Sequence, residues 1–125
     1  MNNKSYTLPI SGAFDAITAR MKVRELARTR GLNITDQARI SLAAYSLATA
    51  LELGNKYPGR IIVDFLDSDN RTGLRVSCIT DEAAIGSFDP KALSNAKWLV
   101  DDLVIETLPS GQVQATVTQW SAARR

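Results

Sequence analysis

An alanine-rich apolar repeat between residues 40 and 51 constrains the fold more than any other feature of this sequence. Ile40, Ala43, Ala44, Leu47 and Leu51 recur at intervals of three or four residues. That spacing places all five on one face of a helix, and the small alanine side chains let such a helix approach a sheet closely. We expect Thr35 to cap the start of the helix and Gly54 to end it. Asp36 would lie in the first turn, where the positive end of the helix dipole stabilises a carboxylate.

The segment before this helix predicts an edge strand followed by another helix. Pro9 donates no backbone hydrogen bond, so residues 6–10 are expected at the edge of a sheet. Residues 12–30 are expected to be helical, with Ser11 as the N-terminal cap and Gly31 closing the C-terminal end. The apolar face predicted for this helix consists of Phe14, Ile17 and Met21.

The segment after the alanine-rich helix predicts two hairpins separated by a third helix. The strands of the first are expected at 60–66 and 74–80, and those of the second at 103–108 and 112–120. Pro90 is suited to begin the helix between them, which should run to about residue 102. On that helix we interpret Trp98 as a core residue, with a role as an anchor for a partner as the alternative, since tryptophan is enriched at interface hot spots.

The resulting order of elements, β-α-α-β-β-α-β-β, favours an α+β fold. Strand pairs alternate with helices, whereas a parallel sheet would need repeated β-α-β units. We therefore expect a two-layer sandwich in which helices pack on one face of a mixed, mainly antiparallel sheet. Cys78 lies in an apolar strand and is expected to be a small core residue.

Composition excludes several kinds of chemistry. The 125 residues include no histidine and one cysteine, which removes histidine-based nucleophile pairs, histidine metal sites, thiolate cages and an internal disulfide. Asp64, Asp67 and Asp69 lack the glycine and the following glutamate of an EF-hand, so no metal site is expected there. No apolar run reaches the ~18 residues of a membrane span and residues 1–6 do not resemble a signal peptide, so we expect a cytoplasmic protein without membrane contact.

Basic side chains are concentrated in the first half of the chain. Residues 1–63 carry nine basic and four acidic side chains, whereas residues 64–125 carry six and nine. Arg20, Arg24 and Arg28 are spaced four apart and should form a stripe on their helix. A solvated helix face and a docking surface for an acidic protein both explain this stripe. Nucleic acid is disfavoured, because no aromatic residues are interleaved with the basic ones.

Three segments resemble the small single-domain form of the GHKL ATPase fold, and in particular the RsbT-like serine kinase and anti-sigma factor family. The six residues from Thr35 to Ile40 resemble the start of that family's long helix. Leu8-Pro9-Ile10-Ser11 resembles its opening strand, and residues 93–103 with the hairpin ending at Trp120 resemble its last helix and strands. The resemblance covers nearly the whole chain and implies one GHKL ATPase-like domain over residues 1–125.

Where this family binds ATP and Mg²⁺, the present sequence departs from its pattern. The helical Glu-x-x-x-Asn motif supplies a base and a metal ligand in the family, and here those positions hold Ser46 and Ala50. The Asp-x-Gly-x-Gly loop contacts adenine in the family, and here it keeps Asp81 but has Ala83 and Ile85 at the glycine positions. The phosphate-binding glycines are absent from Asp89-Pro90-Lys91-Ala92, so we expect the ATP lid to be reduced or absent.

These departures lead us to expect a degenerate, non-catalytic relative that binds neither ATP nor Mg²⁺. We interpret Asp81 as a strand-end residue that caps a turn, with a relic adenine contact as the alternative. The resemblance implies a regulatory role in partner switching, with a STAS-domain antagonist, a sigma factor or a protein serine phosphatase as partner, or a homodimer or heterodimer with a family member. The partner would bind Arg20, Arg24, Arg28 and Trp98. The alternatives are an active serine kinase that phosphorylates a STAS-domain protein and an unrelated α+β domain.

Overall fold

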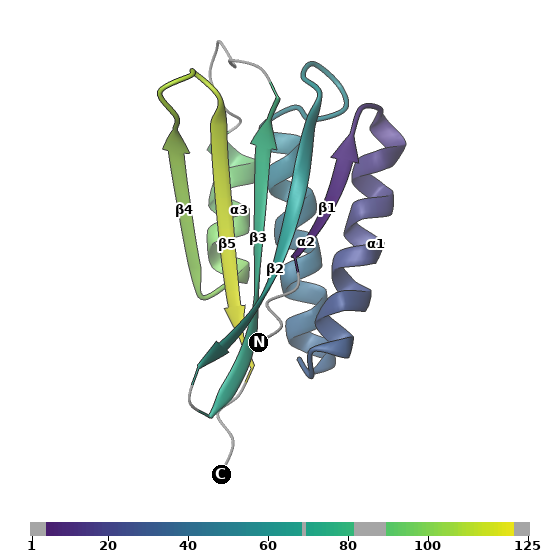
Figure 1. Cartoon of the computed structure of the whole chain (residues 1–125), viewed down its shortest axis with the longest axis vertical. Helices are drawn as coiled ribbons and strands as arrows, with labels where there is room; N and C mark the ends of the chain where they lie inside the picture. Colours follow the sequence, from purple (N-terminus) through teal and green to yellow (C-terminus); the bar gives the residue numbers. More distant parts are fainter. Residues whose placement is uncertain (1–4, 69, 82–89, 122–125) are drawn as a thin grey trace.

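The computed structural model describes residues 5–68, 70–81 and 90–121, which form an α+β fold with two layers. The strands are β1 (Ser5–Ile10), β2 (Gly59–Ser68), β3 (Arg71–Thr80), β4 (Asp102–Thr107) and β5 (Val113–Trp120). The helices are α1 (Ala13–Thr29), α2 (Ile34–Ala50) and α3 (Pro90–Leu99). Figure 1 shows all three helices on one side of the sheet, as the sequence predicts.

The five strands form one sheet in the order β1-β2-β3-β5-β4. Each neighbouring pair is antiparallel, so the sheet is more uniform than the mixed sheet that we expected. The β1 strand pairs with β2 and lies at one edge, which confirms the prediction from Pro9. The first hairpin is longer than predicted, because the polar residues at its tip continue the ladder as far as the pair Ser68–Arg71.

The core lies between the sheet and α2. Val63, Val76 and Val117 occupy successive cross-strand positions on the face that meets the helices, and none is exposed to solvent. The repeat on α2 faces them as predicted, and all five of its apolar residues are buried. The thiol of Cys78 lies 3.8 Å from the carbonyl oxygen of Ala44. This contact illustrates how closely an alanine-rich helix approaches the sheet.

The ends of α1 and α2 differ from the predicted caps by one or two residues. Gly12 precedes α1, and the carboxylate of Asp15 accepts hydrogen bonds from the backbone N–H of Ser11 (2.8 Å) and of Gly12 (3.0 Å). At α2 the cap is Asn33, whose side chain accepts from the N–H of Asp36 at 2.7 Å. An asparagine oxygen two residues earlier thus replaces the hydroxyl of Thr35. Asp36 lies in the first turn as expected.

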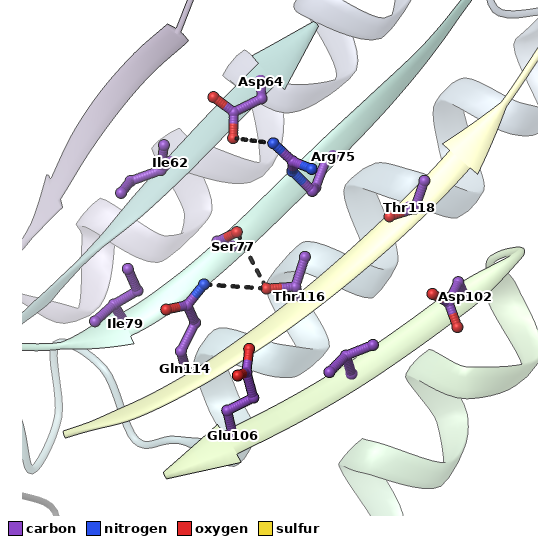
Figure 2. A pocket seen from close by; sticks show the side chains of 11 residues that line it. Ile62, Asp64, Arg75, Ser77, Ile79, Asp102, Glu106, Gln114, Thr116 and Thr118 are labelled. Carbon is purple, nitrogen blue, oxygen red and sulfur yellow. Dashed lines mark hydrogen bonds and ion pairs between the residues drawn. The ribbon is translucent and has the colours of Figure 1, made fainter. Parts of the chain in front are cut away.

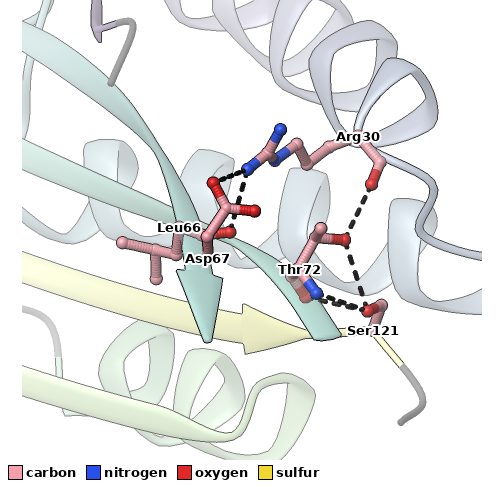
Figure 3. A network of polar contacts seen from close by, with 5 residues as sticks. All are labelled: Arg30, Leu66, Asp67, Thr72 and Ser121. Carbon is pink, nitrogen blue, oxygen red and sulfur yellow. Dashed lines mark hydrogen bonds and ion pairs between the residues drawn. The ribbon is translucent and has the colours of Figure 1, made fainter. Parts of the chain in front are cut away.

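A polar network joins the tip of the first hairpin to the end of α1 (Figure 3). The guanidinium of Arg30 forms an ion pair with Asp67 and donates to the carbonyl of Leu66 at 3.2 Å. The hydroxyl of Thr72 donates to the carbonyl of Arg30 at 2.9 Å. The hydroxyl of Ser121 donates to the carbonyl of Thr72 at 2.8 Å. These contacts hold Leu66, Asp67 and Thr72 in place between the sheet and the end of α1.

Candidate functional site

Ser46 and Ala50 lie one turn apart on α2, where the family resemblance would place a base and a metal ligand. The methyl group of Ala50 is 2% exposed and offers no oxygen to a cation. Ser46 is partly buried, and its hydroxyl is a much weaker base than a carboxylate. Neither side chain therefore offers a carboxylate or a carboxamide oxygen on this turn of α2.

Asp81 follows β3 and is held by three neighbours. Its carboxylate forms an ion pair with Arg60 at 2.8 Å, and its N–H donates to the carbonyl of Pro58 at 2.9 Å. The side-chain amide of Gln112 donates to its carbonyl at 3.0 Å. Any ligand contact of this carboxylate would have to compete with the Arg60 guanidinium.

Thr80, the last residue of β3, faces the helices. Alternate residues of a strand point to opposite faces, so Thr80 shares the buried face with Val76 and Cys78. Thr80 is fully buried, and its hydroxyl accepts a hydrogen bond from the N–H of Val113 at 3.0 Å. The family motif did not single out Thr80. The alternation of buried and exposed positions along β3 could have done so, because it places Thr80 on the same face as Val76 and Cys78. The other positions of this motif, Ala83 and Ile85, lie outside the described residues, as does Asp89.

The apolar face of α1 is opposite to the predicted one. Phe14, Ile17 and Met21 were expected in the core, but they are 81%, 46% and 68% exposed. The buried side chains are the smaller set Ala16, Ala19, Val23, Leu26 and Ala27. A shift of two positions turns a helix by about 200°. The face with the small residues is the buried one because it lets α1 pack closely on α2. The larger apolar side chains are consequently exposed to solvent.

The three arginines predicted as a stripe are all exposed on α1, but their surroundings differ. Arg20 lies over the ring of Tyr45 on α2, 5.6 Å from its centroid. Arg24 and Arg28 have no ion-pair or hydrogen-bond partner among the described residues. Between them, Glu25 is engaged by Lys22 at 3.0 Å, and this hydrogen bond lowers the pKa of the Glu25 carboxyl.

A surface hollow of about 570 Å³ lies where α1 meets the start of α2. Its lining consists of Met21, Arg24, Glu25, Arg28, Ile34 and Gln37. Ile34 is 73% exposed, so the hollow is flanked by apolar side chains from both helices. The side-chain amide of Gln37 donates to the carbonyl of Leu32 at 2.8 Å and fixes the turn beneath it. We call this region the α1–α2 hollow.

Trp98 is 86% exposed on α3, which corrects its predicted place in the core. Among the side chains described on this helix, residues 94–99, Ala96 is fully buried. Trp98 belongs to α3 and the arginine stripe to α1, and α2 packs between these two helices (Figure 1). The structure therefore does not join Trp98 and the arginines into one surface.

The other face of the sheet is open and polar. A shallow hollow of about 550 Å³ lies there. Figure 2 shows the side chains that line it. Ser77 and Thr116 share a hydrogen bond of 3.1 Å across β3 and β5, and Gln114 donates to Thr116 at 3.4 Å. Asp102 and Glu106 extend this face along β4. In the described ranges, no cluster of three or more acidic or cysteine side chains could hold a metal ion.

Comparison with known proteins supports the fold and leaves the family open. No family model matches the sequence, and no curated protein matches it. A crystal structure of the RsbU and RsbW domains of Rv1364c from Mycobacterium tuberculosis matches with a TM-score of 0.68 and 23% sequence identity. The match covers 97% of this chain but 34% of the other, so the present chain spans about a third of its length. None of the described helices is both long and apolar enough to cross a membrane.

Proposed function

We propose that this chain is a non-catalytic protein-binding module of a partner-switching pathway. Its fold is similar to that of a protein with RsbU and RsbW domains. Its sequence also resembles the serine kinase and anti-sigma factor family named above. The observation that carries the proposal is Ala50, an alkyl group at the position of the metal ligand.

The expected loss of nucleotide affinity is large. One missing polar partner reduces binding by roughly 1–3 kcal/mol. A micromolar nucleotide affinity corresponds to about −8 kcal/mol, so three or four such losses leave almost none of it. Ser46, Ala50 and the two substituted glycine positions, Ala83 and Ile85, would contribute most of this loss. The ion pair between Asp81 and Arg60 adds to it, because adenine would have to displace the guanidinium.

The partner in this proposal is an acidic protein of the pathway: a STAS-domain antagonist, a sigma factor or a protein serine phosphatase. The exposed arginines Arg20, Arg24 and Arg28 supply charge complementarity, and charged surfaces of this kind steer association and select partners. Trp98, on a separate helix, offers a second contact. Homodimers and heterodimers with a family member belong to the same class of function.

Two measurements test this proposal. Calorimetry with ATP and Mg²⁺ should give no binding tighter than about 100 µM, which is near −5.5 kcal/mol. Co-purification with the products of neighbouring genes should recover a STAS-domain, sigma or phosphatase protein. Tight ATP binding, or a failure to bind any of these protein classes, would contradict the proposal.

The alternative is an active serine kinase, and the observation in its favour is that Asp81 is retained. A phosphorylation assay with radiolabelled ATP and a STAS-domain protein separates the two functions. A labelled serine would establish the kinase, whereas a complex without label supports the binding module.

A further inference from the structure

The exposed side chains of α1 form one continuous stripe with two chemically different halves. Phe14, Ile17, Met21, Arg24 and Arg28 follow one another at intervals of 3, 4, 3 and 4 residues. Such spacing is that of the contact positions of a helix that packs lengthwise on another helix. The first three are apolar and exposed, and the last two are cationic and without an ion-pair partner in the described part of the chain.

We propose that this stripe, together with the α1–α2 hollow, binds an amphipathic helix of a partner protein that is apolar at one end of its contact face and acidic at the other. The apolar end would cover Phe14, Ile17 and Met21. The acidic end would reach Arg24 and Arg28, where the hollow between Met21 and Ile34 receives one more apolar side chain. The identity of the partner rests on the proposed function, whereas the shape and charge of the surface do not.

A second copy of this chain does not fit the same surface. Pairing α1 with its own copy in parallel would place Arg24 and Arg28 against their equivalents. In the antiparallel arrangement the arginines would need carboxylates near the other end of the helix, and the candidate there is Asp15. That carboxylate already accepts from Ser11 and Gly12 at the start of α1, and Glu25 is held by Lys22. Helix α1 of a second copy therefore does not supply the free carboxylates that Arg24 and Arg28 require, and an acidic helix of a different protein does.

The stripe and the α1–α2 hollow are preorganised in the free chain. Gly31 has a φ of +89° and turns the chain after α1, and Asn33 caps α2. The hydrogen bond from Gln37 to Leu32 closes the same turn. Because these contacts fix Ile34 relative to Met21, little ordering remains to be done when the helix docks. The distance from Phe14 to Arg28 is about 21 Å along the axis, so a partner helix of about four turns matches it.

A matched pair of peptides tests the proposal by fluorescence anisotropy. Both are about 15 residues long and stapled on the outer face, because isolated helices of that length are marginal in water. Both carry leucine at the first three contact positions; one has glutamate at the last two and the other has lysine. We expect the glutamate peptide to bind at least tenfold more tightly than the lysine peptide at low salt.

Variants of the protein make the test specific. The double variant R24E/R28E should reverse the order of the two peptides, and M21E should weaken both at least tenfold. R39E is the matched control, because Arg39 is an exposed arginine of α2 outside the hollow, and it should leave both affinities unchanged. Circular dichroism establishes that each variant is folded.

Equal affinity for the two peptides, no binding of either, or no reversal in R24E/R28E would overturn the inference. Failure of the proposed function gives a different result. If a STAS-domain, sigma or phosphatase partner binds R24E/R28E as well as the wild type, the pathway stands and this surface is wrong. If the glutamate peptide binds but none of those proteins does, the surface stands and the pathway is wrong.

Discussion

The hydroxyl of Thr72 donates to the carbonyl oxygen of Arg30 at 2.9 Å, and this bond links the start of β3 to the end of α1. T72V keeps the branched shape and removes the hydroxyl. We expect a loss of about 1–2 kcal/mol in the free energy of unfolding, because a half-buried carbonyl loses its partner. Urea denaturation measures this change. T107V, at an exposed strand position with no side-chain hydrogen bond in the described structure, should stay within about 0.5 kcal/mol of the wild type.

Gly54 and Gly31 provide a pair of glycines that differ in their surroundings. Both have positive φ, +79° and +89°, so alanine at either position is strained by about 1–2 kcal/mol. A Cβ at Gly54 would lie 2.4 Å from the carbonyl oxygen of Gly12, whereas one at Gly31 would meet nothing within 4 Å. We therefore expect G54A to lower the melting temperature clearly more than G31A does. Equal shifts would mean that the loop after α2 yields without disturbing α1.

The stability of the folded chain depends on the ionisation of Asp15 at acid pH. Hydrogen bonds from the backbone of Ser11 and Gly12, and then from the Ser11 hydroxyl, lower the pKa of this carboxyl from 3.8 in the folded chain. A lowered pKa contributes stability above the unfolded value, and this contribution is lost as the pH falls through the folded value. D15A should therefore be less stable than the wild type at pH 7, and the difference should shrink as the pH falls from the unfolded pKa of 3.8 through the lower pKa of the folded chain. D102A serves as the control, because the carboxylate of Asp102 has no hydrogen bond or ion pair in the described structure, although its backbone pairs with β5.

Burial makes the single cysteine unreactive. Desolvation raises the pKa of the Cys78 thiol to about 12, so the reactive thiolate is scarce near neutral pH. We expect a thiol reagent such as iodoacetamide to modify the native chain only as fast as the chain opens. The chain unfolded in urea should react at once. Fast labelling of the folded protein would show that α2 separates from the sheet more readily than its close packing indicates.

The two tryptophans differ in exposure, and fluorescence distinguishes them. Trp98 is 86% exposed, whereas Trp120 is half-buried with the guanidinium of Arg71 4.7 Å from its ring centroid. The variant W120F keeps only Trp98 and should show red-shifted emission that acrylamide quenches efficiently. W98F should show the opposite. If Trp98 is instead protected, α3 packs differently from the structure described above.

Period and turn chemistry were enough to predict the fold in this sequence. The alanine-rich repeat, Pro9, Gly31 and the two hairpins are all confirmed, and so is the layer of helices on one face. Which face of α1 is buried could not be predicted from the size of its apolar side chains. Two stripes compete on that helix, and close packing against α2 selects the small residues around Ala19 and Val23, which hydrophobicity alone ranks below Phe14.

The candidate site was only partly predictable, for a related reason. A motif comparison names positions such as Ser46 and Ala50, but not the neighbours that occupy a side chain. The ion pair of Asp81 joins residues 21 positions apart, and the α1–α2 hollow depends on which face α1 presents. Both follow from tertiary packing. The charge stripe was visible in the sequence because its spacing is local.

The outward face of α1 also has a consequence for the lone chain in solution. Phe14, Met21 and Ile34 keep large apolar areas in water, and contiguous exposed patches of this kind promote self-association. A docked helix would cover that area, so the partner would act as a solubilising subunit as well as a target. The concentration at which the isolated chain begins to aggregate would then rise with partner occupancy, which makes simple turbidity a measure of complex formation.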